Sequence, residues 1–190
     1  MQIWVGLGNP GAQYALQRHN VGFMVADILA EIHNFSAWTK KFRSLVCEGR
    51  IGRDKVLLVK PQTFMNLSGD AVQQALAFYK LDLDALTVFH DELDLAPMKI
   101  KVKHGGGTAG HNGLRSIDAH LGPDFRRVRI GIGHPGHKDR VTGYVLGNYS
   151  KAEMEPLSDL LAAIASEADW LANGDEVRFM NDVALRMHQE

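Results

Sequence analysis

The sequence has very little cysteine and no long hydrophobic run. Cys47 is the only cysteine among 190 residues, which excludes an internal disulfide and a cluster of metal-binding thiolates. No apolar run approaches the roughly 18 residues that a helix needs to cross a bilayer. Residues 1–9 are too short and too poor in positive charge for a secretory signal. We therefore expect a cytoplasmic protein that does not bind membranes, with Cys47 packed in its interior.

The sequence also lacks a large net charge, but its charges are unevenly distributed. The formal charge is −1, yet residues 98–151 contain 10 Lys and Arg against 3 Asp and Glu, whereas the remainder contains 11 against 19. A basic segment within an acidic chain predicts a local anion-binding face, for example one for phosphates. The alternative is a solvated strand face with no ligand.

Strand patterns alternate with helical patterns along the chain, and no linker or repeat interrupts them. We expect strands at 2–8, 44–51, 55–61, 85–94, 98–104 and 125–133, and helices at 21–34, 70–81, 111–122, 154–172 and from about 175. The turn at 52–54 predicts a hairpin, which makes the sheet mixed. The pattern predicts a single α/β domain over residues 1–190, with a mixed, mostly parallel twisted sheet and helices on both faces.

Local signals place several side chains. Asn20 is a favourable N-cap for the helix at 21–34, and Ser150 with Glu153 forms a capping box before the helix at 154–172. Period-two alternation puts Lys99, Lys101 and Lys103 on one face of their strand. That face is therefore either exposed or directed toward a ligand.

Two glycine-rich strings, "GLGNPG" at 6–11 and "GIGHPG" at 131–136, match the G-x-G-x-x-G pattern of dinucleotide-binding proteins. In that fold a helix begins at the third glycine and an acid follows about 20 residues later. Neither string has this context, so a nicotinamide-dependent oxidoreductase is a weak alternative and we expect no cofactor. We interpret both strings as strand exits where backbones pass closely, stiffened by Pro10 and Pro135.

Compact polar side chains follow several predicted strand exits and suggest one cleft. They are Asn9, His19, Asn66, Asp91, His111 and Asn112. A His–Asp pair that activates water is the simplest chemistry, because histidine supplies a base near neutral pH and a carboxylate fixes its tautomer. Asparagine amides suit the stabilisation of an oxyanion, although each Asn could equally serve as a turn or cap residue.

Other chemistries have less support. Ser68 lies outside a G-x-S-x-G elbow and Cys47 lies within a strand, which disfavours covalent catalysis. The strings "HPGH" at 134–137 and "HDELD" at 90–94 lack a standard helical or thiolate ligand spacing. We therefore expect no metal site.

Five segments occur in order between residues 6 and 136: "GLGNPGAQYALQRHNVG", "KPQTFMNLSG", "HDELDL", "GGGTAGHNGL" and "RIGIGHPG". Together they resemble the bacterial-type peptidyl-tRNA hydrolase family, and the helical C-terminal tail fits that family in length. The resemblance implies a monomeric enzyme without metal or cofactor. It would cleave the ester between a peptide and the 3′ end of tRNA, and so recycle tRNA from aborted translation.

The resemblance also implies roles for individual residues. His19 matches the catalytic base, Asp91 matches the carboxylate that orients it, and Asn9 matches a residue that positions substrate and stabilises the tetrahedral intermediate. Asn66 matches a residue with the same role as Asn9, and Asn112 one that holds substrate and water. The residues that match the lining of the cleft are Tyr14, Phe64, Met65 and His111. The residues that match tRNA phosphate contacts are Lys103 and Arg129. We expect Lys138 to extend the same basic surface.

The chain departs from the family pattern in the glycine loop, where Thr108 and Ala109 replace the usual His and Gly. The mobility and RNA contacts that the resemblance implies for this loop therefore do not carry over directly to this chain. The match of His19 and Asp91 to the family is unaffected. The charge pattern alone would also allow a non-catalytic RNA-binding module, which is the main alternative function.

Overall fold

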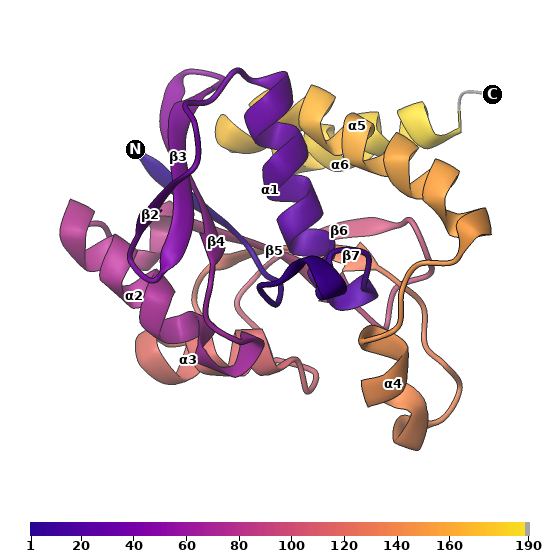
Figure 1. The fold of residues 1–190 in the computed structure, drawn as a ribbon. Coiled ribbons are helices and arrows are strands. Elements are labelled where there is room, and N and C mark those ends of the chain that lie inside the picture. Colours follow the sequence, from indigo (N-terminus) through magenta and orange to yellow (C-terminus); the bar gives the residue numbers. More distant parts are fainter. Residues whose placement is uncertain (189–190) are drawn as a thin grey trace.

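A computed structural model describes residues 1–188, which form a seven-stranded sheet with helices on both faces (Figure 1). The strands are β1 (Gln2–Gly6), β2 (Thr39–Lys41), β3 (Ser44–Ile51), β4 (Asp54–Pro61), β5 (Leu86–Glu92), β6 (Ile100–His104) and β7 (Arg126–Gly131). The longer helices are α1 (Val21–Ile32), α2 (Ser68–Tyr79), α3 (Asn112–Leu121), α5 (Met154–Ala172) and α6 (Glu176–Met187), and α4 (Val141–Val145) is short.

The strand order in the sheet is β2-β3-β4-β1-β5-β7-β6. The four central strands β4, β1, β5 and β7 are parallel, and the antiparallel pairs lie at the two edges. The predicted mixed α/β sheet is therefore confirmed, with the predicted hairpin joining β3 and β4. Because parallel strands end at the same edge, the residues that follow β1, β4 and β5 are brought together.

Two hydrophobic clusters cover the two faces of the sheet. The side chains of α1, α5 and α6 pack on one face, where Trp4 and Phe89 belong to the cluster. The side chains of α2 and α3 pack on the other, around Val5 and Leu57. Figure 1 shows these helices on opposite sides of the strands, with α4 projecting away from both layers. Cys47 is buried in the first cluster as expected, and burial raises the pKa of its thiol to about 12.

Close backbone contact explains the first glycine string. A Cβ atom on Gly6 would lie 2.0 Å from the carbonyl oxygen of Gly22, and one on Gly22 would lie 2.4 Å from the amide nitrogen of Leu7. Strand β1 and helix α1 therefore pack with almost no space between their backbones, which fixes the segment that precedes α1 against the end of β1. No cofactor is needed to explain these glycines.

The structure differs from the sequence-based expectations in several details, one of which is the short edge strand β2, which was not predicted. Helix α2 begins at Ser68, two residues before the predicted range, and α4 lies where the sequence shows no helical periodicity. Helix α4 has only five residues and none of them is fully buried, although Tyr144 and Val145 pack partly buried against the core, so the segment is too short to show a strong helical period. Asn20 precedes α1 as expected but makes no side-chain capping bond. The capping box of Ser150 and Glu153 is present.

Within residues 1–188, no helix combines the length and the apolar character that crossing a membrane requires.

Candidate active site

His19 and Asp91 form a buried pair at the edge where β1 and β5 end. His19 lies in the 3₁₀ turn Arg18–Asn20, just before α1, and Asp91 is the penultimate residue of β5. The His19 Nδ1 atom lies 2.9 Å from Asp91 Oδ2, and their side chains are 9% and 2% exposed. With its Nδ1–H donating to the carboxylate, His19 presents Nε2 as the atom that can accept a proton.

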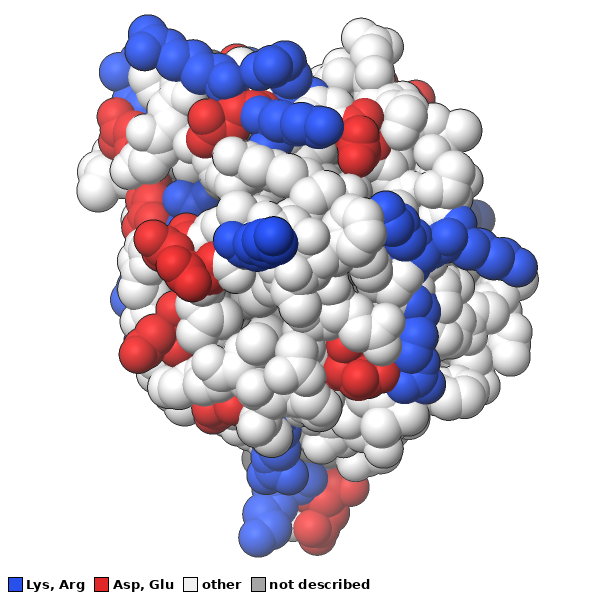
Figure 2. Space-filling model, turned by 90° about the vertical axis from the view of Figure 1, so that its left-hand side faces the viewer, with Lys and Arg blue, Asp and Glu red and all other residues white. Residues whose placement is uncertain are grey.

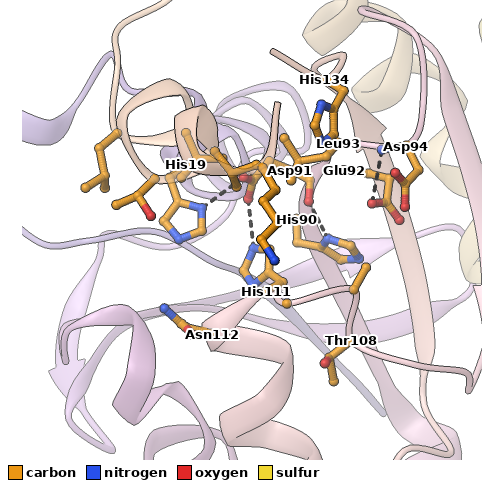
Figure 3. A pocket seen from close by; sticks show the side chains of 17 residues that line it. His19, His90, Asp91, Glu92, Leu93, Asp94, Thr108, His111, Asn112 and His134 are labelled. Carbon is orange, nitrogen blue, oxygen red and sulfur yellow. Dashed lines mark hydrogen bonds and ion pairs between the residues drawn. The ribbon is translucent and has the colours of Figure 1, made fainter. Parts of the chain in front are cut away.

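His111 shares the same carboxylate. Its Nε2 atom lies 2.8 Å from Asp91 Oδ1, while its Nδ1 accepts hydrogen bonds from the backbone amides of Gly113 and Leu114. Because Nδ1 is an acceptor, the proton of the neutral ring must reside on Nε2, directed at Asp91. Asp91 therefore accepts hydrogen bonds from two histidines, as Figure 3 shows.

The environment keeps Asp91 ionised. Burial disfavours the carboxylate, but His111 and His19 more than offset this effect, so the pKa of Asp91 lies well below its ordinary value. A permanently charged acceptor can hold the tautomer of His19 and stabilise the imidazolium that forms after proton transfer. Sequence reasoning did not foresee that His111 binds Asp91.

Asn9 is held in place by a set of contacts that leaves its amide nitrogen available. Its Oδ1 accepts a hydrogen bond of 2.9 Å from the backbone amide of Met65, so its NH₂ group must point away from that amide. The side chain of Asn20 bonds both the backbone amide and the carbonyl of Asn9, each at 2.9 Å. Asn20 is thus a positioning residue that sequence reasoning assigned only to helix capping.

A cavity of about 360 Å³ opens beside these groups. Its lining includes His19, Asp91, His111 and Asn112, together with His134 and Lys138 from the loop before α4. Figure 3 shows the rings of His19 and His111 directed at the Asp91 carboxylate, with Asn112 farther from it. Five of the predicted site residues, Lys138 among them, thus line one cavity.

The other predicted cleft residues are not part of the lining of this cavity. Met65 is buried, and a Cβ on Gly113 would lie 2.6 Å from Met65 Sδ and 3.1 Å from His111 Cε1, so this side chain packs near His111. Phe64 and Asn66 are exposed on the loop after β4, and Tyr14 is partly exposed in the turn after β1. Their predicted contacts with substrate stay predictions.

His19, Asp91 and His111 are also the one group among the described residues that could hold a metal ion, because their ligand atoms lie within 4.8 Å of one another. In the observed arrangement both histidines use these nitrogens to bond the carboxylate. A metal ion would have to replace both of these hydrogen bonds. The polar atoms of the three residues are therefore already paired with one another, in an arrangement suited to proton transfer.

His90 is a histidine that the sequence analysis did not assign to the site. Its Nδ1 donates to the carbonyl oxygen of Asp91 at 2.8 Å, its ring packs edge-on against His111, and among the described residues its buried Nε2 has no partner. Burial, reinforced by His111, lowers the pKa of His90 to about 3. The ring is therefore neutral whenever the protein is folded above that pH.

The neutral state of His90 predicts a loss of stability in acid. Below about pH 6.5 the unfolded chain protonates this residue, whereas the folded protein resists until about pH 3. The free energy of unfolding should fall by up to about 1.4 kcal/mol per pH unit from this group. We expect urea unfolding between pH 6 and pH 4 to show that the free energy of unfolding of His90→Asn changes less with pH than that of the wild type. The His137 side chain is 65% exposed, so His137→Asn should show the same pH dependence as the wild type. Equal slopes for wild type and His90→Asn would contradict this assignment.

Four cations line one face of the β6–β7 pair. Lys101 lies opposite Arg129 and Lys103 lies opposite Arg127, while Val102 and Val128 point to the core on the other face. Like charges directly opposite each other destabilise a sheet, so this arrangement favours an anionic partner over a purely structural role. Lys101 and Lys103 are exposed, as the period-two pattern predicted.

A second cavity of about 250 Å³ adjoins this face beneath the glycine loop, and Lys103, Arg127 and Arg129 contribute to its lining. Arg129 lies 3.6 Å from Glu92, so part of its charge is compensated. Arg127 is 1% exposed and donates to the carbonyl oxygens of Gly107 and Pro123. Burial lowers the pKa of Arg127. The bond from Arg127 to Gly107 holds the glycine loop against β7.

Known proteins similar to this chain match it over nearly its whole length. The peptidyl-tRNA hydrolase family model matches residues 3–190. Peptidyl-tRNA hydrolases of Rhizorhabdus wittichii and Novosphingobium aromaticivorans are 69% and 71% identical over 187 and 186 residues, covering 98% of this chain and 99% and 97% of the relatives. A crystal structure of peptidyl-tRNA hydrolase from Acinetobacter baumannii superimposes with a TM-score of 0.90 at 40% identity, covering 96% of this chain and 94% of that one.

Proposed function

Because the chain belongs to the peptidyl-tRNA hydrolase family, we propose that it hydrolyses the ester between the peptide and the tRNA in peptidyl-tRNA. The observation that supports this most directly is the buried His19–Asp91 pair at the border of an open cavity. We further propose that residues 1–190 act as one monomeric domain in the cytoplasm, on a substrate bound through its tRNA.

The geometry supports a reaction by activated water. His19 Nε2 takes a proton from water as its oxygen attacks the ester carbonyl carbon, and Asp91 stabilises the resulting imidazolium. Collapse of the tetrahedral intermediate breaks the bond to the 3′ oxygen of tRNA. That oxygen takes the proton from His19, which leaves free tRNA and a peptide with a new carboxylate.

The asparagines supply donors for the charge that develops on the carbonyl oxygen. Asn9 is suited to this role because the Met65 amide fixes its Oδ1 and turns its NH₂ group away. Asn112 lines the cavity at the start of α3, next to His111. We assign Asn66, on the exposed loop after β4, to the positioning of substrate.

Incubation of the purified protein with peptidyl-tRNA and a metal chelator tests the proposed function. Free tRNA and peptide should appear at the same rate with and without chelator. Binding of peptidyl-tRNA without release of either product would instead support the alternative of a non-catalytic RNA-binding module. A rate abolished by the chelator would overturn the metal-independent scheme.

Lys103 and Arg129 should contribute to the salt dependence of tRNA binding. Each phosphate contact releases condensed counterions, so Lys103→Ala and Arg129→Ala should each weaken binding and reduce the slope of log K against log salt by about one. Lys55→Ala is a suitable control, because Lys55 forms an exposed ion pair with Glu48 at the opposite end of the sheet. Unchanged slopes in both test variants would place the phosphate contacts elsewhere.

A further inference from the structure

A separate basic hollow lies at the same edge of the sheet as the active site, on the side of β2. Its cavity has a volume of about 650 Å³, and its lining includes Lys40, Lys41, Arg43, Gln62 and Thr63. Cross-strand pairing places Lys41 beside Ser44 and Ser44 beside Pro61, the last residue of β4. The hollow therefore adjoins the loop after β4, which continues to Met65 and Asn66.

The hollow has an excess of positive charge. Arg43 forms an ion pair with Asp70, Lys41 Nζ lies 3.9 Å from the centroid of the Phe78 ring, and Lys40 has no charged partner among residues 1–188. Figure 2 faces the side of the molecule that bears β2 and α2, and shows basic side chains along its right and upper margins with some acidic side chains beside them. Three cations compensated by one acid favour an anionic ligand.

Thr63 is an independent sign of a ligand. Its side chain lines the hollow and the residue is only 6% exposed, yet its hydroxyl has no hydrogen-bond partner among the described residues. A buried hydroxyl without a partner is costly, by about 1–3 kcal/mol. An oxyanion in the hollow would accept a hydrogen bond from this hydroxyl and would also pair with the cations.

The hairpin turn between β2 and β3 is also unusual. Phe42 and Arg43 have φ angles of 53° and 50°, a conformation that non-glycine residues adopt at a cost. Hairpin turns of this kind favour Asn-Gly. The chain instead places an aromatic residue and a cation at the tip, which fits a requirement for these side chains.

The hollow lies on the β4 side of the active site, where we expect the peptide part of the substrate to bind. In the proposed reaction the ester lies at His19 and Asp91, near the ends of β1 and β5, and the proposed phosphate contacts Lys103 and Arg129 lie on β6 and β7 to one side. The peptide is attached to the other side of the ester and would therefore extend toward β4. There Phe64 and Leu67 are 58% and 45% exposed and offer an apolar path toward the hollow.

The distance along this path can be estimated from the sheet. Three strand spacings separate β1 from β2, which corresponds to about 14 Å. An extended chain covers about 3.3–3.6 Å per residue, so the hollow lies about four residues from the ester.

We infer that the hollow of Lys40, Lys41, Arg43 and Thr63 binds acidic side chains of the peptide, about four to six residues from the ester. The inference rests on the proposed hydrolysis of peptidyl-tRNA and adds a substrate preference to it. A carboxylate in the hollow can accept hydrogen bonds from the cations that line it and from the Thr63 hydroxyl. Peptidyl-tRNAs with acidic residues in this window are therefore preferred substrates.

The test compares kcat/KM for two peptidyl-tRNAs that share the tRNA and the three residues next to the ester but have Glu or Gln at residues four to six. At low salt the wild type should cleave the Glu substrate about three- to tenfold faster, the effect of a few exposed ion pairs. The double variant Lys40→Gln/Arg43→Gln should lose this preference and cleave the Gln substrate normally. Thr63→Val should reduce the preference, and Lys55→Gln should retain it.

Equal rates of the wild type on both substrates would overturn the inference. Equal losses on both substrates in the double variant, with a smaller salt slope, would show that the hollow binds tRNA instead, and would overturn it as well. A wild type that cleaves neither substrate would contradict the proposed hydrolysis itself, which distinguishes the two failures.

Discussion

Replacement of His19 by alanine is expected to lower kcat for ester hydrolysis by about 10²–10⁴-fold, the usual contribution of a positioned general base. The loss follows from the geometry, because Asp91 holds Nδ1 and leaves Nε2 as the atom that takes the proton from water. Affinity for tRNA should change little, because the proposed phosphate contacts lie on β6 and β7. Single-turnover hydrolysis and a binding titration at fixed salt measure the two effects separately.

Two further variants control for structural damage at this buried position. His19→Asn retains an N–H group that can donate to Asp91 but has no basic nitrogen, so it should be as inactive as His19→Ala and more stable. His104→Ala removes a histidine whose ring is 66% exposed at the opposite end of the sheet, and should be fully active. Near-normal hydrolysis by folded His19→Asn protein would eliminate His19 as the base.

The sheet and most of its helices could be predicted because periodic burial dictates them. The alternation in β6 predicted an exposed lysine face, and the apolar spacing predicted α2 through buried Val72 and Leu76. The rule that parallel strands end at one edge also predicted that residues after β1 and β5 would meet. The structure brings His19 and Asp91 within 2.9 Å in this way.

Features that depend on contacts between distant segments could not be predicted from local patterns. Asn20 is of a residue type that is favoured at helix N-caps, but its side chain forms hydrogen bonds with the backbone of Asn9 instead. The proton on His111 Nε2 is determined by two backbone amides of α3, which no spacing in the sequence reveals. The burial of Arg127 likewise depends on the glycine loop, whose carbonyl at Gly107 it binds.

The second large effect is expected from Asp91→Asn, which preserves shape but removes one acceptor. The Asn oxygen can accept from only one histidine, and its NH₂ group would face the N–H of the other. His111 cannot readily change its tautomer, because its Nδ1 already accepts from Gly113 and Leu114. His19 should therefore change, with its proton moving to Nε2.

This change would remove the base without removing His19, so Asp91→Asn should lose about 10²–10⁴-fold in kcat at neutral pH. Because the two residues act as a unit, Asp91→Asn combined with His19→Asn should be no slower than either single variant. Asp84→Asn, an exposed carboxylate at the far end of the sheet, should be unaffected. Multiplying losses in the double variant would show that Asp91 acts independently of His19, and would contradict the role derived from their contact.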